Sequence, residues 1–185
     1  MNSFIAKFLK IAFVSCLVLS AAGLAAGQQT AFGADGPAEK EFYRLTDAAP
    51  AAFKAGDIEK AKRLADALLV QAETLRENWN YGNAVHAAHL VFGHAAFAEG
   101  KIDDAKNFLI LAGNIPGSPQ LKSFGPDMTL AKKLLEKNER ETVIKYFDLC
   151  AKFWDPKHAK LVEWKAEVLK GDTPDFGANL RYRGF

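Results

Sequence analysis

The chain has 185 residues, 49% of them hydrophobic, and a formal net charge of +2, which suits one globular domain with a single core. Its first 27 residues carry two lysines and no acid, so the other 158 residues hold 22 Lys and Arg against 22 Asp and Glu. A neutral domain has no general attraction for a phosphate backbone, and we therefore expect no nucleic-acid partner.

The N-terminal segment has the three parts of a secretory signal. Its first ten residues include Lys7 and Lys10, the next nine are apolar apart from Ser15, and small residues follow up to Gly27. The apolar run covers 16 residues, fewer than the roughly 20 that a membrane-spanning helix needs. We therefore predict a cleaved signal peptide over residues 1–27, with an uncleaved N-terminal anchor as the alternative.

Beyond this signal we expect an exported protein, periplasmic or extracellular, without a membrane span. Residues 28–37 are small and polar, which predicts a linker. Apolar residues then recur with a period near 3.6 through most of residues 38–172, and no stretch alternates convincingly with a period of two. The sequence therefore predicts an all-α helical domain, followed by an irregular tail over residues 173–185.

The predicted domain contains about seven helices, separated by Gly, Asn and Pro. Pro37 can open the first helix, Pro50 is expected to kink or split it, and Asp57 is expected to cap the second. Residues 114–126 hold three Pro and two Gly and are expected to be irregular. The predicted helices span residues 38–55, 58–75, 83–99, 102–112, 129–137, 139–154 and 156–170.

Two segments of the domain repeat each other. Residues 51–62 (AAFKAGDIEKAK) and 95–106 (AAFAEGKIDDAK) agree at seven of twelve positions, at an offset of 44 residues. Each segment holds the end of one helix, a Gly turn and the start of the next helix. The Gly permits a tight reversal, and an Ala five residues later lets the paired helices approach closely. A repeated helical hairpin is typical of a stacked helical array.

The repeat also has a characteristic spacing: a small residue, Gly seven positions later and Ala five positions after that. It occurs at Ala49, Gly56 and Ala61 and again at Gly93, Gly100 and Ala105. This spacing resembles the tetratricopeptide repeat over about residues 41–116 and implies stacked antiparallel hairpins. The period of 44 departs from the usual value of about 34, and Ala52 and Ala96 stand at the family's aromatic position. A third unit is indicated only by Leu135, Asn138 and Val143.

The C-terminal part is similar to an uncharacterised family of exported bacterial proteins. The resemblance lies in residues 117–128 (GSPQLKSFGPDM) and 174–180 (PDFGANL) and implies no activity. We expect the aromatic loop residues Phe124 and Phe176 to plug the open end of the helical stack. A functional loop is the alternative.

The tetratricopeptide resemblance implies a non-enzymatic module that binds a protein or peptide along a concave surface lined by the first helix of each hairpin. On that surface it would place Tyr43, Thr46, Phe53 and Lys54 from the first unit and Ala87, Leu90, His94, Phe97 and Ala98 from the second. The clamp that some relatives use for C-terminal carboxylates is missing, so a short apolar or aromatic peptide is the expected ligand. The equal alternative is that Phe53 and Phe97 are core residues.

Three histidines support an alternative function. His86, His89 and His94 share one predicted helix, which would suit a small metal-dependent or hydrolytic enzyme together with Asp127. No HExxH motif or cysteine partner completes a ligand set, so we expect these histidines to pack and hydrogen-bond. Asp127 is expected to cap a helix. We therefore predict no metal, no cofactor and no catalytic residue.

Cys150 is the one cysteine that follows the predicted signal peptide. Its spacing from neighbouring apolar residues places it on the inner stripe of a helix, and we expect it to be buried. Pairing between two chains is the alternative. A self-associating envelope component is the third functional hypothesis.

Overall fold

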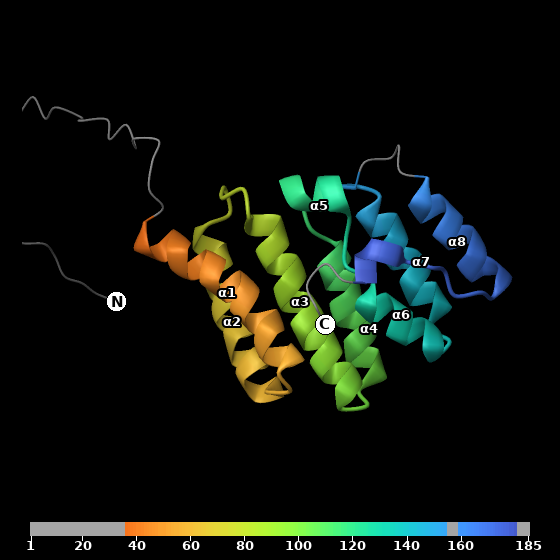
Figure 1. Ribbon diagram of the computed structural model, residues 1–185, viewed down its shortest axis with the longest axis horizontal. Helices are drawn as coiled ribbons and strands as arrows, with labels where there is room; N and C mark the ends of the chain where they lie inside the picture. The colour runs from red at the N-terminus through yellow and green to blue at the C-terminus, as the bar shows by residue number, and fades with distance from the viewer. Residues whose placement is uncertain (1–35, 155–158, 181–185) are drawn as a thin grey trace, which may run out of the picture. The chain divides into compact units, whose positions relative to one another are not determined.

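The computed structural model describes residues 36–154 and 159–180. The predicted signal peptide and most of the predicted linker lie outside these ranges. Within them the chain forms eight α-helices and no strand, which confirms the all-α prediction (Figure 1). The elements are α1 (Pro37–Lys54), α2 (Ile58–Thr74), α3 (Tyr81–Ala98), α4 (Ile102–Gly113), α5 (Pro119–Phe124), α6 (Thr129–Glu136), α7 (Arg140–Cys150), α8 (Lys160–Lys170) and the short 3-10 helix η1 (Gly177–Leu180).

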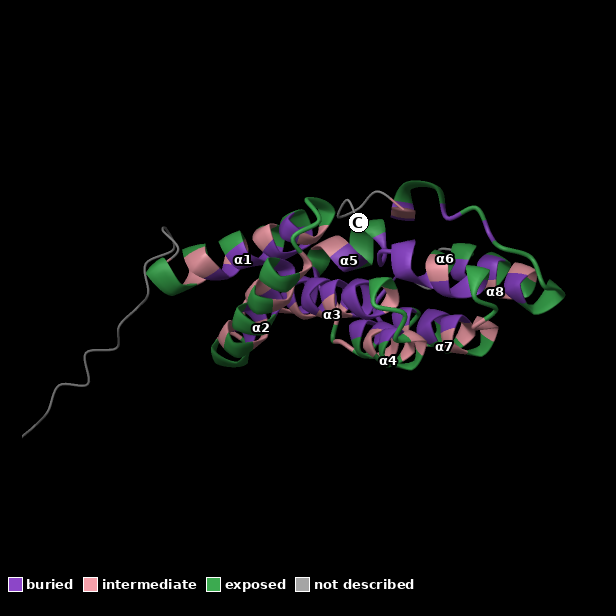
Figure 2. Ribbon diagram, turned by 90° about the horizontal axis from the view of Figure 1, so that it is seen from below, coloured by how far each residue is buried: buried purple, intermediate pink, exposed green. Residues whose placement is uncertain are grey.

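The helices pack largely in the order of the chain. α1 packs on α2 and both contact α3, α3 packs on α4, α4 contacts α6 and α7, and α7 contacts α8. α3 therefore has neighbours on several sides and is buried along most of its length, as Figure 2 shows. The short α5 also contacts α3. This arrangement brings the first turn of α3 close to both α1 and α5.

The two repeated segments adopt the same turn. Gly56 and Gly100 have φ angles of 82° and 74°, a left-handed conformation that favours glycine. In the first turn the N–H of Asp57 donates to the carbonyl five residues earlier at 3.0 Å, and in the second the N–H of Lys101 does the same at 2.9 Å. This is the Schellman pattern of a helix C-terminus. The sequence match at an offset of 44 residues therefore corresponds to a match in backbone geometry.

The turn between α6 and α7 has the same pattern. Asn138 takes the left-handed position with φ 63°, and the N–H of Glu139 donates to the carbonyl of Leu134 at 3.0 Å. Val143 follows five residues later and is fully buried, as are the equivalent alanines of the first two hairpins. The indication of a third hairpin from Leu135, Asn138 and Val143 thus has a structural counterpart.

Salt bridges recur between successive hairpins. Lys62 on α2 pairs with Glu99 in the next turn at 3.0 Å, and Lys106, its equivalent on α4, pairs with Glu139 in the following turn at 2.9 Å. Each side chain is about 30% exposed, so solvent screens the pairs and their contribution to stability is small. The pairs show that the spacing between hairpins is also repeated.

Two predictions about the helices need correction. Of the two effects expected of Pro50, a kink or a split, the split does not occur, because α1 continues to Lys54 while Leu45, Ala49 and Ala52 on both sides of the proline are buried. This packing offsets the hydrogen bond that a proline removes. Residues 114–126 are not wholly irregular, because they contain α5. Its N-cap Ser118 accepts a hydrogen bond from the N–H of Leu121 at 3.1 Å, and a proline occupies its first turn.

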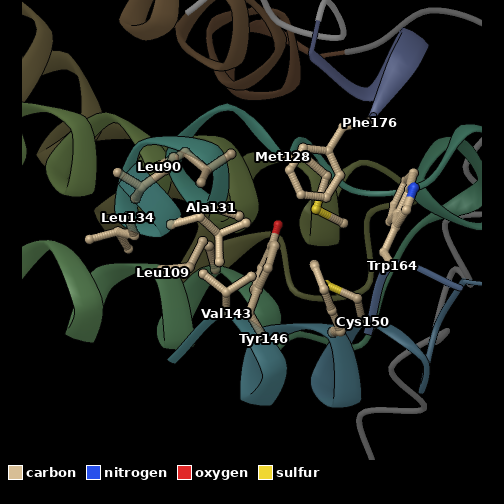
Figure 3. Packing of buried hydrophobic residues seen from close by; sticks show 14 of the residues in the cluster. Leu90, Leu109, Met128, Ala131, Leu134, Val143, Tyr146, Cys150, Trp164 and Phe176 are labelled. Carbon is tan, nitrogen blue, oxygen red and sulfur yellow. The ribbon is translucent and has the colours of Figure 1, made fainter. Parts of the chain in front are cut away.

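The core has two parts. The first hairpin and α3 meet through a seam rich in alanine, which includes Ala61, Ala65, Ala84 and Ala88, all fully buried. The second part extends from α3 to α8 and uses larger side chains, among them Leu90, Leu109, Met128, Leu134, Tyr146 and Trp164 (Figure 3). Small residues in the first part allow close packing of the helices. In both parts, the apolar residues that recur along the predicted helices face the interior.

The two loop segments expected to form a plug, around Phe124 and around Phe176, contact each other at the C-terminal end of the helical domain. The ring of Phe176 is fully buried and lies edge-on to Trp164 at 5.0 Å (Figure 3). The side-chain amide of Asn179 donates to the carbonyl oxygens of Phe124 and Pro126 at 3.0 and 2.9 Å. The described part of the predicted tail is therefore not wholly irregular, because it contains the 3-10 helix η1, and its residues Phe176 and Asn179 are buried. The ring of Phe124 is 64% exposed, so only Phe176 plugs the core.

Candidate functional site

A polar cavity of about 350 Å³ opens where α1, the loop before α3, the first turn of α3 and α5 come together. It is lined by Tyr43, Thr46, Asp47, Trp79, Asn80, Asn83 and Gln120. Tyr43 and Thr46 were among the residues expected to contact a partner. The other five were not.

Two aromatic rings form one wall of the cavity. The rings of Tyr43 and Trp79 are 5.6 Å apart and inclined by 34°. The loop from Leu75 to Asn80 holds Trp79 in place, because the N–H of Asn78 donates to the carbonyl of Leu75 at 3.0 Å and the N–H of Asn80 donates to the side chain of Asn78 at 2.9 Å. Trp79 remains 52% exposed, although large aromatic rings are usually buried. A half-exposed tryptophan beside a half-buried tyrosine is a ready contact surface for a ligand.

Side-chain amides form the floor of the cavity and join three elements. Asn80 donates to the hydroxyl of Thr46 on α1 at 3.2 Å. Asn83 donates to Asn80 at 3.0 Å and to Gln120 on α5 at 2.7 Å, and accepts a hydrogen bond from Ser118 at 3.0 Å. Both N–H groups of the Asn83 amide are therefore used. These hydrogen bonds hold the side chains of the network in fixed positions.

A close contact between two glycines brings α5 over the cavity. A Cβ atom on Gly82 would lie 1.8 Å from the carbonyl oxygen of Gly117, so the two backbones touch directly. On its other side Gly117 faces Phe153, whose Cβ would be 2.5 Å from a Cβ placed on Gly117. Only glycine fits at both positions, and the contact places Gln120 next to Asn83.

The remaining residues expected on the concave surface lie elsewhere. Leu90 and His94 are buried, with 0% and 1% exposure, so the prediction that they contact a partner is wrong. Ala87 is also buried. The cause is α6, which packs against α3 and covers this face of the helix. Phe53 and Phe97 are half-buried, with the ring of Phe53 5.5 Å from that of His94, while Lys54 and Ala98 are exposed on α1 and α3.

The cavity residues that the sequence did not reveal share one signal. Asn78, Asn80 and Asn83 surround Trp79 within six residues, in and beside the gap between the helices predicted over residues 58–75 and 83–99. Asp47 and Gln120 carried no signal, because their place in the cavity depends on the packing of α1 and α5 against α3. A run of asparagines around a tryptophan between two helices could have been recognised as a polar contact surface.

The histidines of α3 do not converge on a site. His86 is fully buried; one ring nitrogen bonds the carbonyl of Ala112 at 2.8 Å and the other accepts from the N–H of Asp127 at 3.3 Å. His89 stacks on Phe108 with the rings 6.4 Å apart, and burial lowers its pKa. Among the described residues, no group of three His, Cys, Asp or Glu is placed to hold a metal ion. The metal-dependent alternative therefore has no assembled set of ligands within the described residues.

His94 belongs to a buried chain of hydrogen bonds. It bonds the hydroxyl of Thr129 at 2.9 Å and accepts from the ammonium of Lys133 at 3.3 Å, while Thr129 donates to the carboxylate of Asp127. The carboxylate of Asp127 also accepts from the N–H of Thr129 at 2.8 Å and so binds the first turn of α6, although Met128, and not Asp127, occupies the N-cap position. Burial, assisted by the charge of Lys133, lowers the pKa of His94 from 6.5 to about 3. The ring is therefore neutral at ordinary pH and joins α3 to α6.

Cys150 is fully buried on α7, as predicted. Burial raises the pKa of its thiol well above the usual value, so the thiol stays protonated. A thiol in this position cannot reach a second chain without opening the core. The alternative of pairing between chains is therefore not supported by the fold.

The polar cavity is the best-formed candidate site, since it combines exposed aromatic rings with ordered amides. Comparison of the chain with known protein families, with curated proteins and with solved structures finds no match.

Proposed function

We propose that the protein is an exported, non-enzymatic interaction module of the tetratricopeptide-like class, which binds a protein or peptide segment at the polar cavity between α1, α3 and α5. The recurring Schellman turns and the recurring Lys–Glu pairs between hairpins support the repeat class. The N-terminal signal pattern supports export. Within the described ranges, no helix has both the length and the apolar character required to cross a bilayer.

The observation that carries the proposal is the composition of the cavity. An exposed aromatic wall can receive an apolar or aromatic side chain, and fixed amides can bond the main chain of a peptide. Asp47 is the one charged side chain among the described lining residues. The part of the chain that the structure describes thus brings no lysine or arginine to the cavity, which disfavours a C-terminal carboxylate and favours an internal, uncharged segment.

A peptide-library selection tests this proposal. The chain purified after expression of the full sequence is exposed to random peptides, and the enriched peptides are tested against Trp79→Ala and against Val70→Ala as a matched control. Val70 is 72% exposed on α2 and lies outside the cavity. We expect Trp79→Ala to lose the enriched peptides and Val70→Ala to retain them. Equal binding by both variants, or no enrichment, would contradict the proposal.

A further inference from the structure

The hydrogen-bonding groups of the polar cavity are not evenly balanced between donors and acceptors. The amide oxygens of Asn80, Asn83 and Gln120 each already accept a hydrogen bond from a neighbouring side chain. The hydroxyl oxygen of Tyr43 accepts from Asn78 at 3.0 Å. Each of these neutral acceptors thus already has a partner within the protein, and a second bond at its other lone pair is not required.

Several donors of the cavity have no partner among the described residues. These are the hydroxyl hydrogen of Tyr43, the indole N–H of Trp79 and both N–H groups of the Gln120 amide. All of them are uncharged. A ligand that satisfies them must present several neutral acceptors and needs few donors in return.

Proline-rich peptides have this property. An ordinary peptide residue carries one N–H and one carbonyl, whereas proline carries only the carbonyl. A proline-rich segment also adopts the polyproline II helix, which has no internal hydrogen bonds and leaves its carbonyls available. Such a segment can accept from the free donors of the cavity without leaving an N–H of its own unsatisfied.

The aromatic wall favours the same ligand. Proline-rich segments dock on grooves lined by aromatic side chains, and their preformed conformation lowers the entropic cost of binding. The inclined rings of Tyr43 and Trp79, with Trp79 about half exposed, form such a surface next to the donors. Building on the function proposed above, we infer that the polar cavity binds a proline-rich segment in the polyproline II conformation.

The direct test is a titration with octaproline blocked at both ends, followed by tryptophan fluorescence. The chain has three tryptophans, and Trp154 and Trp164 are only 3% and 4% exposed, so a change in emission on binding reports mainly on Trp79. A blocked Gly–Ser peptide of equal length serves as the ligand control. We expect saturable binding of octaproline and none of the Gly–Ser peptide.

Three variants connect this binding to the free donors. Trp79→Phe and Tyr43→Phe keep an aromatic ring but remove a donor, and Gln120→Glu keeps the acceptor for Asn83 but removes both free N–H groups. Each change should weaken octaproline binding by about 2- to 13-fold, the usual effect of one hydrogen bond. Isothermal titration calorimetry measures the affinity of Trp79→Phe, whose fluorescence no longer reports the site. Circular dichroism confirms that each variant is folded.

Lys122→Gln is the matched control for Gln120→Glu. Both changes lower the net charge by one on the short helix α5, but Lys122 is exposed and does not line the cavity. We expect Lys122→Gln to bind octaproline like the wild type. Equal weakening by both variants would mean that charge, and not the loss of donors, governs binding, and would overturn the inference.

The remaining outcomes separate this inference from the proposed function. If non-proline peptides bind in a Trp79-dependent way and octaproline does not, the inference is wrong and the peptide-binding proposal stands. If a neutral oligosaccharide such as chitohexaose binds and no peptide does, both are wrong. Octaproline binding that none of the three variants weakens would place the peptide elsewhere and would also overturn the inference.

Discussion

Replacing Gly82 by alanine tests how the polar cavity is built. The new Cβ would lie 1.8 Å from the carbonyl oxygen of Gly117, and real Cβ atoms do not approach closer than 3.0 Å. The backbone at Gly117 must therefore move by roughly 1.2 Å, but Phe153 closes the space behind it. Such overpacking costs about 1–3 kcal/mol, and the better helix propensity of alanine returns up to about 1 kcal/mol.

We therefore expect Gly82→Ala to lower the free energy of unfolding by about 1–2 kcal/mol, as measured by urea denaturation. Displacement of Gly117 also moves α5, so the hydrogen bonds from Asn83 to Gln120 and from Ser118 to Asn83 should weaken, and ligand binding should fall with them.

Gly93→Ala is the matched control on the same helix. Its Cβ would meet Cδ2 of Leu130 at 2.4 Å, and the end of a leucine side chain can turn away. This variant should lower stability by less than Gly82→Ala does and should leave ligand binding unchanged. If Gly82→Ala matched the wild type in both stability and binding, the account of the glycine contact would be refuted.

Three further predictions concern the stability of the helical fold. Asn138→Ala should lower the free energy of unfolding by about 1 kcal/mol, because φ is 63° at this position, whereas Asn138→Gly should be neutral or stabilising in the same urea assay. The pKa of His94 is lowered in the folded state to about 3, so the unfolded chain binds a proton first as the pH falls and the folded state loses stability from about pH 6.5 downward. Replacing His94 by Gln should therefore flatten the pH dependence of the urea midpoint between pH 6.5 and 5, because protonation of His94 accounts for about 1.5 kcal/mol of the lost stability in this range. An unchanged slope would contradict the lowered pKa of His94. Phe176→Ala removes a fully buried ring that packs against Trp164, so it should lower the free energy of unfolding by about 3–5 kcal/mol and reduce the near-ultraviolet circular dichroism signal. A decrease of less than about 1 kcal/mol would show that the C-terminal segment does not complete the core.

Local features of the fold could be predicted because their chemistry is local. Gly56 and Gly100 mark turns in which the left-handed backbone favours glycine, and Asp57 caps the next helix through its own side chain, at 3.0 Å from the N–H of Lys60. Asn138 gave a weaker signal, since asparagine tolerates this backbone but also occurs in many other turns. Ser118 and Pro119 are typical residues for the start of a helix, but the Pro and Gly residues around them favoured an irregular segment, so α5 was not predicted.

The candidate site could be predicted only in part, because it depends on contacts between distant residues. Tyr43 was identified from its position on the first helix of a hairpin, but its aromatic partner Trp79 follows the second helix, and Gln120 comes from a helix that was not predicted. The face of α3 that holds Leu90 and His94 was expected to be open. A hydrogen bond to Thr129 and the packing of α6 close it, and the period of apolar residues within one helix does not reveal such a neighbour.

The central claim is that a peptide or protein segment binds at the cavity lined by Tyr43 and Trp79. The most direct measurement is a proton–nitrogen correlation spectrum of the three tryptophan indole groups, recorded while a library-selected peptide is added. We predict that one indole signal, identified by its absence in Trp79→Phe, shifts in proportion to binding while those of Trp154 and Trp164 stay in place. A shift confined to the buried tryptophans, or no shift at saturating peptide, would contradict the claim.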